Sequence, residues 1–98
     1  MKDLIFVFSV DVGYGVEESY THICKAQTLP RAIGTLQKFL NKDLEPEDKE
    51  ISYQDVKDEY IDNINVFDLE LNKEIYFTND VREKGITKIM DEITEALK

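Results

Sequence analysis

Apolar and polar residues alternate along the first segment of the chain, which is typical of a β-strand. One face of this segment carries Leu4, Phe6, Phe8, Val10 and Val12. The opposite face is also apolar near its start, at Ile5 and Val7, so we expect this strand to lie in the centre of a sheet. A turn at Gly13-Tyr14-Gly15 follows, because glycine tolerates the backbone angles of tight turns.

A second alternating segment over residues 19–27 completes a predicted β-hairpin. Tyr20, His22, Cys24 and Ala26 share one face of it, whereas Thr21 and Ile23 share the other. We expect His22 and Cys24 to lie half-buried beneath a helix.

Residues 29–41 follow the spacing of an amphipathic helix. Thr28 is placed to cap its N-terminus, and Pro30 suits a first helical turn because its missing N–H would be unpaired there anyway. The apolar stripe consists of Leu29, Ala32, Ile33, Leu36 and Leu40, with Phe39 beside it. The helix is predicted to end near Asn41.

An acidic insert follows this helix. Residues 43–50 form a predicted loop, and Ser52 with Asp55 resembles a capping box that begins a short helix over residues 52–62. One side of that helix would carry Tyr53, Val56 and Tyr60, followed by Ile64. The opposite side would carry the carboxylates of Asp55, Asp58, Glu59 and Asp62. The competing interpretation is a strand over residues 60–71 that starts early.

A third strand is predicted from Ile64 through Leu69 to Leu71. Its alternation changes phase between Val66 and Phe67, as a β-bulge or two buried faces would cause. Asn72-Lys73 is predicted to be a two-residue turn into the next strand.

A fourth strand over residues 74–78 would place Ile75 and Phe77 opposite Tyr76. A C-terminal amphipathic helix is predicted from the spacing of Ile86, Ile89, Met90, Ile93 and Leu97. It could begin as early as Asp80, with Gly85 as a weak point.

These elements predict a single α+β domain over residues 1–98, in the order ββα, acidic insert over residues 43–62, ββα. Each predicted helix has one apolar stripe to bury, so an antiparallel sheet of about four strands with the helices on one face is the expected packing. Such a sheet has two free edges, and one of them could pair with a second copy in a homodimer.

Net charge is concentrated in the insert. Residues 43–62 hold nine acids and two lysines, a net charge of −7, out of −9 for the whole chain. A field of this sign repels nucleic acid and anionic membranes and attracts basic protein surfaces. We therefore expect neither direct nucleic-acid binding, which depends on lysine and arginine, nor membrane binding.

The candidate chemistry is sparse. His22 and Cys24 are the single histidine and cysteine, and two ligands do not make a zinc site. Gly13-x-Gly15 lacks the other parts of a phosphate-binding loop. We therefore predict no catalytic residues, no metal site and no cofactor. A single cysteine fits a reducing compartment and the N-terminal apolar run is short, so a cytoplasmic protein is expected.

Two resemblances bear on function. The chain is similar in size and charge to small acidic phage proteins that inhibit restriction or CRISPR nucleases, in which carboxylates imitate phosphates. The opening ββα order loosely resembles antitoxin domains of the HicB type. That family has a Pro-Gly motif before the helix, where this chain has Thr28-Leu29-Pro30, so no residue role is transferred.

The resulting expectation is a non-enzymatic cytoplasmic module that binds a basic protein surface, as an inhibitor or regulator of a nucleic-acid-binding protein would. The contact residues would be Asp55, Asp58, Glu59 and Asp62, with Tyr14 as a further contact. One alternative is that the acids only keep the chain in solution. Another is an accessory subunit that associates through a sheet edge or the C-terminal helix. A third is a small enzyme with a site around His22 and Cys24 at a dimer interface.

Overall fold

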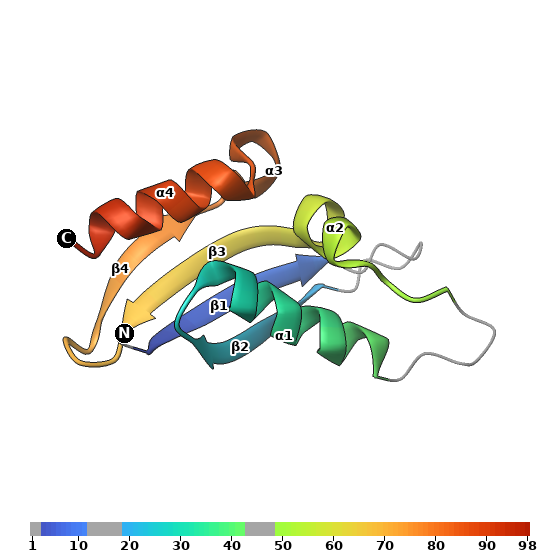
Figure 1. Cartoon of the computed structure of the whole chain (residues 1–98), viewed down its shortest axis with the longest axis horizontal. Coiled ribbons are helices and arrows are strands. Elements are labelled where there is room, and N and C mark those ends of the chain that lie inside the picture. Colours follow the sequence, from blue (N-terminus) through green and yellow to red (C-terminus); the bar gives the residue numbers. More distant parts are fainter. Residues whose placement is uncertain (1–2, 12–18, 43–48) are drawn as a thin grey trace.

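A computed structural model of the chain describes residues 3–11, 19–42 and 49–98. Figure 1 shows one antiparallel sheet with the helices packed on one of its faces, which confirms the predicted α+β fold. The strands are β1 (Leu4–Asp11), β2 (Ser19–Ala26), β3 (Ile61–Asp68) and β4 (Lys73–Thr78). The helices are α1 (Leu29–Asn41), α2 (Tyr53–Asp55), α3 (Val81–Lys84) and α4 (Ile86–Ala96), and η1 (Val56–Tyr60) is a π-helical turn directly after α2.

The strand order is β2-β1-β3-β4, so β1 is a central strand as its two apolar faces predicted. Phe6 of β1 lies between Cys24 of β2 and Val66 of β3. The side chains that alternate toward the helices form the core, because this face is closed to water. Its β1 members are Leu4, Phe6, Phe8 and Val10, all almost fully buried.

Helix α1 begins and ends where its sequence signals predicted. The Oγ1 atom of Thr28 accepts a hydrogen bond from the backbone N–H of Arg31 at 3.4 Å, which satisfies one of the unpaired donors of the first turn. The helix packs against β2 and contributes Leu29, Ala32, Ile33 and Leu36 to the core, all buried. Val12, the Gly13-Tyr14-Gly15 turn and loop residues 43–48 lie outside the described residues.

The short helix of the insert is confirmed over residues 53–60, and Ser52 caps it by accepting from the N–H of Asp55 at 3.1 Å. The predicted extension to residue 62 is wrong, because β3 already begins at Ile61. Ile61 pairs with Val10, and both side chains are fully buried. The early start of the strand therefore lets β3 follow β1 to the end of the core.

The predicted third strand and its turn need correction. β3 ends at Asp68, and residues 69–72 form a turn that is longer than the two residues expected. The buried carboxylate of Asp68 accepts hydrogen bonds from the N–H groups of Glu70 and Leu71, at 2.9 and 3.2 Å. These bonds draw the backbone away from the ladder, an action typical of aspartate in turns. Leu69 and Leu71 are consequently exposed.

The β-bulge predicted at Val66 and Phe67 is present as a register shift against β4, whereas β3 itself alternates regularly from Ile64 through Val66 to Asp68. Val66 pairs with Tyr76 and Phe67 with Glu74, so Ile75 is the extra residue. A bulge turns neighbouring side chains to the same face. Ile75 and Tyr76 therefore both pack against the core, and the predicted placement of Tyr76 opposite Ile75 is wrong.

The C-terminal helical region is divided at Gly85, which separates α3 from α4. Gly85 has a φ of 78° and a ψ of 153°, a backbone conformation open almost exclusively to glycine. Ile86, Ile89 and Ile93 of α4 are buried against the sheet, whereas Met90 and Leu97 remain partly exposed.

Within the described ranges, no helix has the length and apolar character needed to cross a lipid bilayer.

Candidate protein-binding surfaces

Three of the four predicted contact carboxylates lie together on α2 and η1. Asp55, Asp58 and Glu59 are all exposed, and we call them the acidic ridge. The side chains of Asp55 and Glu59 form no ion pair with any described residue, and Asp58 lies 3.9 Å from the Nζ of Lys57. Nε2 of Gln54 also donates to Oδ2 of Asp58 at 2.5 Å.

The ridge rests on a rigid base. Val56 is fully buried beneath it, and Tyr53 and Tyr60 pack against the core on either side, as their spacing predicted. Nη2 of Arg82 donates to the backbone carbonyl oxygen of Glu59 at 2.6 Å, which ties the end of η1 to α3. The backbone that carries the three carboxylates is therefore anchored to the core and to α3.

Asp62, the fourth predicted contact residue, does not belong to the ridge. It lies on β3, and its Oδ1 is 3.1 Å from Nη2 of Arg82. Both side chains are exposed, so this is a surface ion pair between β3 and α3, and the predicted contact role of Asp62 stays a prediction. Tyr14 lies outside the described residues, so its predicted contact role stays a prediction.

His22 and Cys24 lie beneath α1, as predicted. The ring of His22 lies between Phe8 and Phe39, with centroid distances of 6.4 and 5.1 Å, and its Nε2 has no hydrogen-bond partner among the described residues. The Sγ of Cys24 lies 3.9 Å from the carbonyl oxygen of Ala32. Burial lowers the pKa of His22 and raises the pKa of Cys24, so both neutral forms are favoured.

A nucleophilic pair needs the opposite tendencies, a low thiol pKa and a basic partner. The described residues also contain no group of three or more His, Cys, Asp or Glu side chains arranged to hold a metal ion.

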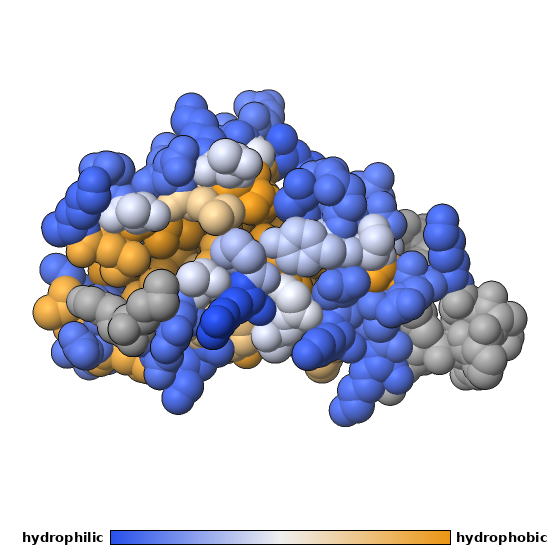
Figure 2. Space-filling model, in the orientation of Figure 1, coloured by the Kyte–Doolittle hydropathy of each residue, from blue (hydrophilic) through white to orange (hydrophobic). Residues whose placement is uncertain are grey.

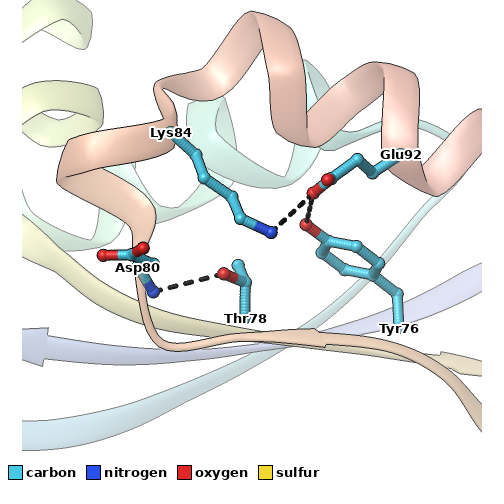
Figure 3. A network of polar contacts seen from close by, with 5 residues as sticks. All are labelled: Tyr76, Thr78, Asp80, Lys84 and Glu92. Atoms are coloured by element: carbon cyan, nitrogen blue, oxygen red, sulfur yellow. Dashed lines mark hydrogen bonds and ion pairs between the residues drawn. The ribbon is translucent and has the colours of Figure 1, made fainter.

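A polar cluster that the sequence analysis did not identify joins β4 to α3 and α4 (Figure 3). The Tyr76 hydroxyl donates to Oε1 of Glu92 at 2.5 Å, and Nζ of Lys84 donates to the same oxygen at 2.9 Å. The hydrogen bond from Tyr76 lowers the pKa of Glu92, and the bond to Glu92 raises the pKa of Lys84. Burial, reinforced by Glu92, raises the pKa of Tyr76.

These directions keep Tyr76 protonated, Lys84 charged and Glu92 ionised at neutral pH. A phenol held protonated in this way is a poor base, so we interpret the cluster as a structural clip. Its members are 8 and 16 residues apart in sequence, and no local pattern marks them.

The sheet face that points away from the helices carries five apolar side chains around the polar Asn65. The residues are Ile5, Val7, Ile23, Phe67 and Phe77, and we call them the sheet-face patch. Ile23 is 64% exposed and Phe77 is 50% exposed, although both side chains are large and apolar. The apolar outward positions of the first two strands were visible in the sequence. That they lie beside Phe67 of β3 and Phe77 of β4 depends on the strand register.

A second apolar surface lies between α1 and α4, where Figure 2 shows hydrophobic atoms beside the helices. It is a groove of about 290 Å³ whose walls include Leu29 and Pro30 of α1 and Met90 of α4, with Leu97 at its end.

Known proteins give no guide to the role of these surfaces: no protein-family model, no curated protein sequence and no solved structure matches this chain.

Proposed function

We propose that the chain is a non-enzymatic module that acts in the cytoplasm and binds a basic surface of a partner protein through its acidic ridge. The observation that carries this proposal is the exposure of Asp55, Asp58 and Glu59 on one anchored helical segment. A nucleic-acid-binding protein is the partner class that fits best, since its cationic groove is built to accept regularly spaced negative charges.

The anchoring of the ridge backbone supports a binding role beyond solubility. Carboxylates that only confer solubility need no fixed geometry, and surface charges normally serve that purpose. Here Val56 holds the segment from below, and Arg82 holds its end through the Glu59 carbonyl group. Charges on an anchored backbone lose less conformational entropy on binding than those of a mobile acidic tail do.

The regional charge supports the same partner class. The ridge lies within residues 43–62, whose net charge is −7, and this segment would increase the rate of encounter with a cationic surface. The free, buried thiol of Cys24 is compatible with the reducing conditions of the cytoplasm.

The test compares two triple variants of equal charge. The ridge variant is Asp55→Lys, Asp58→Lys and Glu59→Lys, and the matched control is Glu83→Lys, Asp91→Lys and Glu95→Lys on the exposed side of α3 and α4. Each tagged protein is incubated with host lysate at low and high salt, and retained proteins are quantified by mass spectrometry.

We expect a basic nucleic-acid-binding protein to be retained by the wild type and the control at low salt and lost at high salt. The same protein should not be retained by the ridge variant. Equal loss in both variants would assign the binding to net charge alone, and equal retention in both would exclude the ridge as the contact. Either result would overturn the proposal.

A further inference from the structure

The strand register places two rows of side chains across the uncovered sheet face. The first row is Ile23, Val7, Asn65 and Phe77, in the order β2, β1, β3, β4. The second row is Lys25, Ile5, Phe67 and Glu74 in the same order. The second row has the apolar residues Ile5 and Phe67 at its centre, whereas the first row has Val7 beside the polar Asn65. The second row ends in a cation on the β2 edge and an anion on the β4 edge, where Oε1 of Glu74 also accepts a hydrogen bond from Nδ2 of Asn65 at 3.4 Å. Lys25 and Glu74 are both exposed.

We propose that the sheet-face patch binds a second copy of this chain, in a symmetric dimer of two sheets packed face to face. A two-fold axis parallel to the strands places β2 of one copy over β4 of the other. Ile23 then faces Phe77 of the second copy, and Lys25 faces Glu74 of the second copy. Symmetry repeats both contacts. The two most exposed apolar residues of the face therefore bury each other, and one ion pair forms at each edge of the interface.

Charge complementarity selects a second copy as the occupant. A chain of net charge −9 repels its own kind over most of its surface. The sheet-face patch is an exception, because its flanking charges have opposite signs at opposite edges and are therefore complementary to themselves. A monomer would also leave the large apolar side chains of Ile23 and Phe77 in water, and exposed apolar patches of this kind often mark a contact surface.

The size of the face sets the strength of the contact. Four strands about 4.8 Å apart, each six to eight residues long, present an area of about 400–500 Å². Two such faces bury about 800–1,000 Å² in total, the low end for specific interfaces. The dimer is thus expected to dissociate in the micromolar range and to depend on protein concentration.

The proposed axis has a consequence for the acidic ridge. A rotation about an axis parallel to the strands leaves each residue at the same height along the strand direction. The acidic ridges of the two copies therefore lie at the same end of the dimer. The dimer contact itself uses none of the ridge residues. The two proposals are therefore independent, and the ridge variant described above should dimerise normally.

Analytical ultracentrifugation of the full chain across about 1 to 300 µM tests the dimer, since this span brackets a micromolar dissociation constant. We expect a monomer–dimer equilibrium. Ile23→Lys and Lys25→Glu should each weaken it about tenfold or more, the latter by placing carboxylates opposite one another in both symmetric contacts. Leu71→Lys is the matched control, because Leu71 is 58% exposed but lies on the turn after β3.

The charge swap gives the decisive measurement. Glu74→Lys alone should weaken the dimer as Lys25→Glu does, and the double variant Lys25→Glu with Glu74→Lys should restore it. Circular dichroism confirms that each variant is folded. A chain that stays monomeric at the highest concentration would overturn the proposal. A dimer that all these variants leave unchanged would also overturn the proposal, because its contact would then lie at a strand edge or on a helix.

Discussion

The side-chain amide of Asn41 forms two hydrogen bonds with the backbone of Ile51. Oδ1 of Asn41 accepts from the Ile51 N–H at 2.7 Å, and its Nδ2 donates to the Ile51 carbonyl oxygen at 2.9 Å. Asn41 thus pairs with Ile51 as a neighbouring strand would. Gln37 donates to the same carbonyl oxygen at 3.2 Å. The last turns of α1 therefore fix the backbone of the acidic insert at Ile51, whose side chain is buried in the core.

Replacing Asn41 with alanine should destabilise the chain by about 1–2 kcal/mol, because two partly buried backbone groups lose a partner. Chemical denaturation would show a lower midpoint with an unchanged slope. Lys42→Ala, one residue further on and exposed, is the control and should change stability little. Equal midpoints for the two variants would show that the Asn41 bonds do not stabilise the fold.

Thr28→Ala should cost about 1 kcal/mol, because the first turn of α1 loses its capping oxygen. Thr28→Ser keeps an oxygen in reach of the Arg31 N–H and should retain most of the stability. Thermal unfolding measures the difference. An alanine variant as stable as the serine variant would mean that Thr28 contributes through its methyl group and not as a cap.

Two glycines should respond to alanine in opposite directions. Gly34 lies inside α1 with open space around an added Cβ, so Gly34→Ala should stabilise the chain by about 0.5–1 kcal/mol. Gly85→Ala should destabilise it by about 1–3 kcal/mol, because its φ of 78° is strained for any residue with a Cβ. The unfolding midpoints of the two variants, each compared with the wild type, would show whether stability rises for Gly34→Ala and falls for Gly85→Ala. A stabilising Gly85→Ala would mean that the junction of α3 and α4 relaxes readily.

The clip of Tyr76, Lys84 and Glu92 should contribute stability between acidic and alkaline limits. The pKa of Glu92 is lowered from 4.5, so its contribution is present above that pH and is lost as pH falls through the lowered value. The pKa values of Lys84 and Tyr76 are raised from 10.5 and 10.0. The contribution of these two groups to stability is therefore present below their ordinary pKa values and is lost as pH rises through the raised pKa values.

Glu92→Gln should therefore lower the melting temperature at pH 7 and reduce the further loss on acidification. The measurement is the melting temperature of the variant and the wild type from pH 3 to pH 8. Glu95→Gln is the control, because Glu95 pairs only with the exposed Lys98 among the described residues. The clip would be excluded as a stabilising element if both variants followed the wild-type curve.

Local patterns determined most of the secondary structure. The alternation of β1 and β2, the Thr28 and Ser52 caps and the apolar stripe of α1 act between residues a few positions apart. Such signals are legible in the sequence because the pleat of a strand, the turn of a helix and a cap each repeat over short distances. They also sufficed for the sheet-and-helix packing, since each helix has one stripe to bury.

The sequence located the bulge in the pairing of β3 with β4, at Val66 and Phe67, but not which strand carried the extra residue. That choice belongs to the pairing with β4, where Ile75 is accommodated as the bulge. The sequence pattern gave no sign of the register shift of β3 against β1 between Ser9 and Val10. The end of β3 at Asp68 likewise depended on competition between the ladder and the side-chain carboxylate.

The surfaces were decided by the tertiary structure. Asp62 shared a helical spacing with Asp55 and Asp58, yet the burial of Ile61 against β1 placed it on a strand beside Arg82. The sheet-face patch exists only because the order β2-β1-β3-β4 aligns residues that are far apart in sequence. Periodicity within one segment determines which face of the element a side chain occupies. Pairing between distant segments determines which other residues lie beside it, and a binding surface depends on that spatial arrangement.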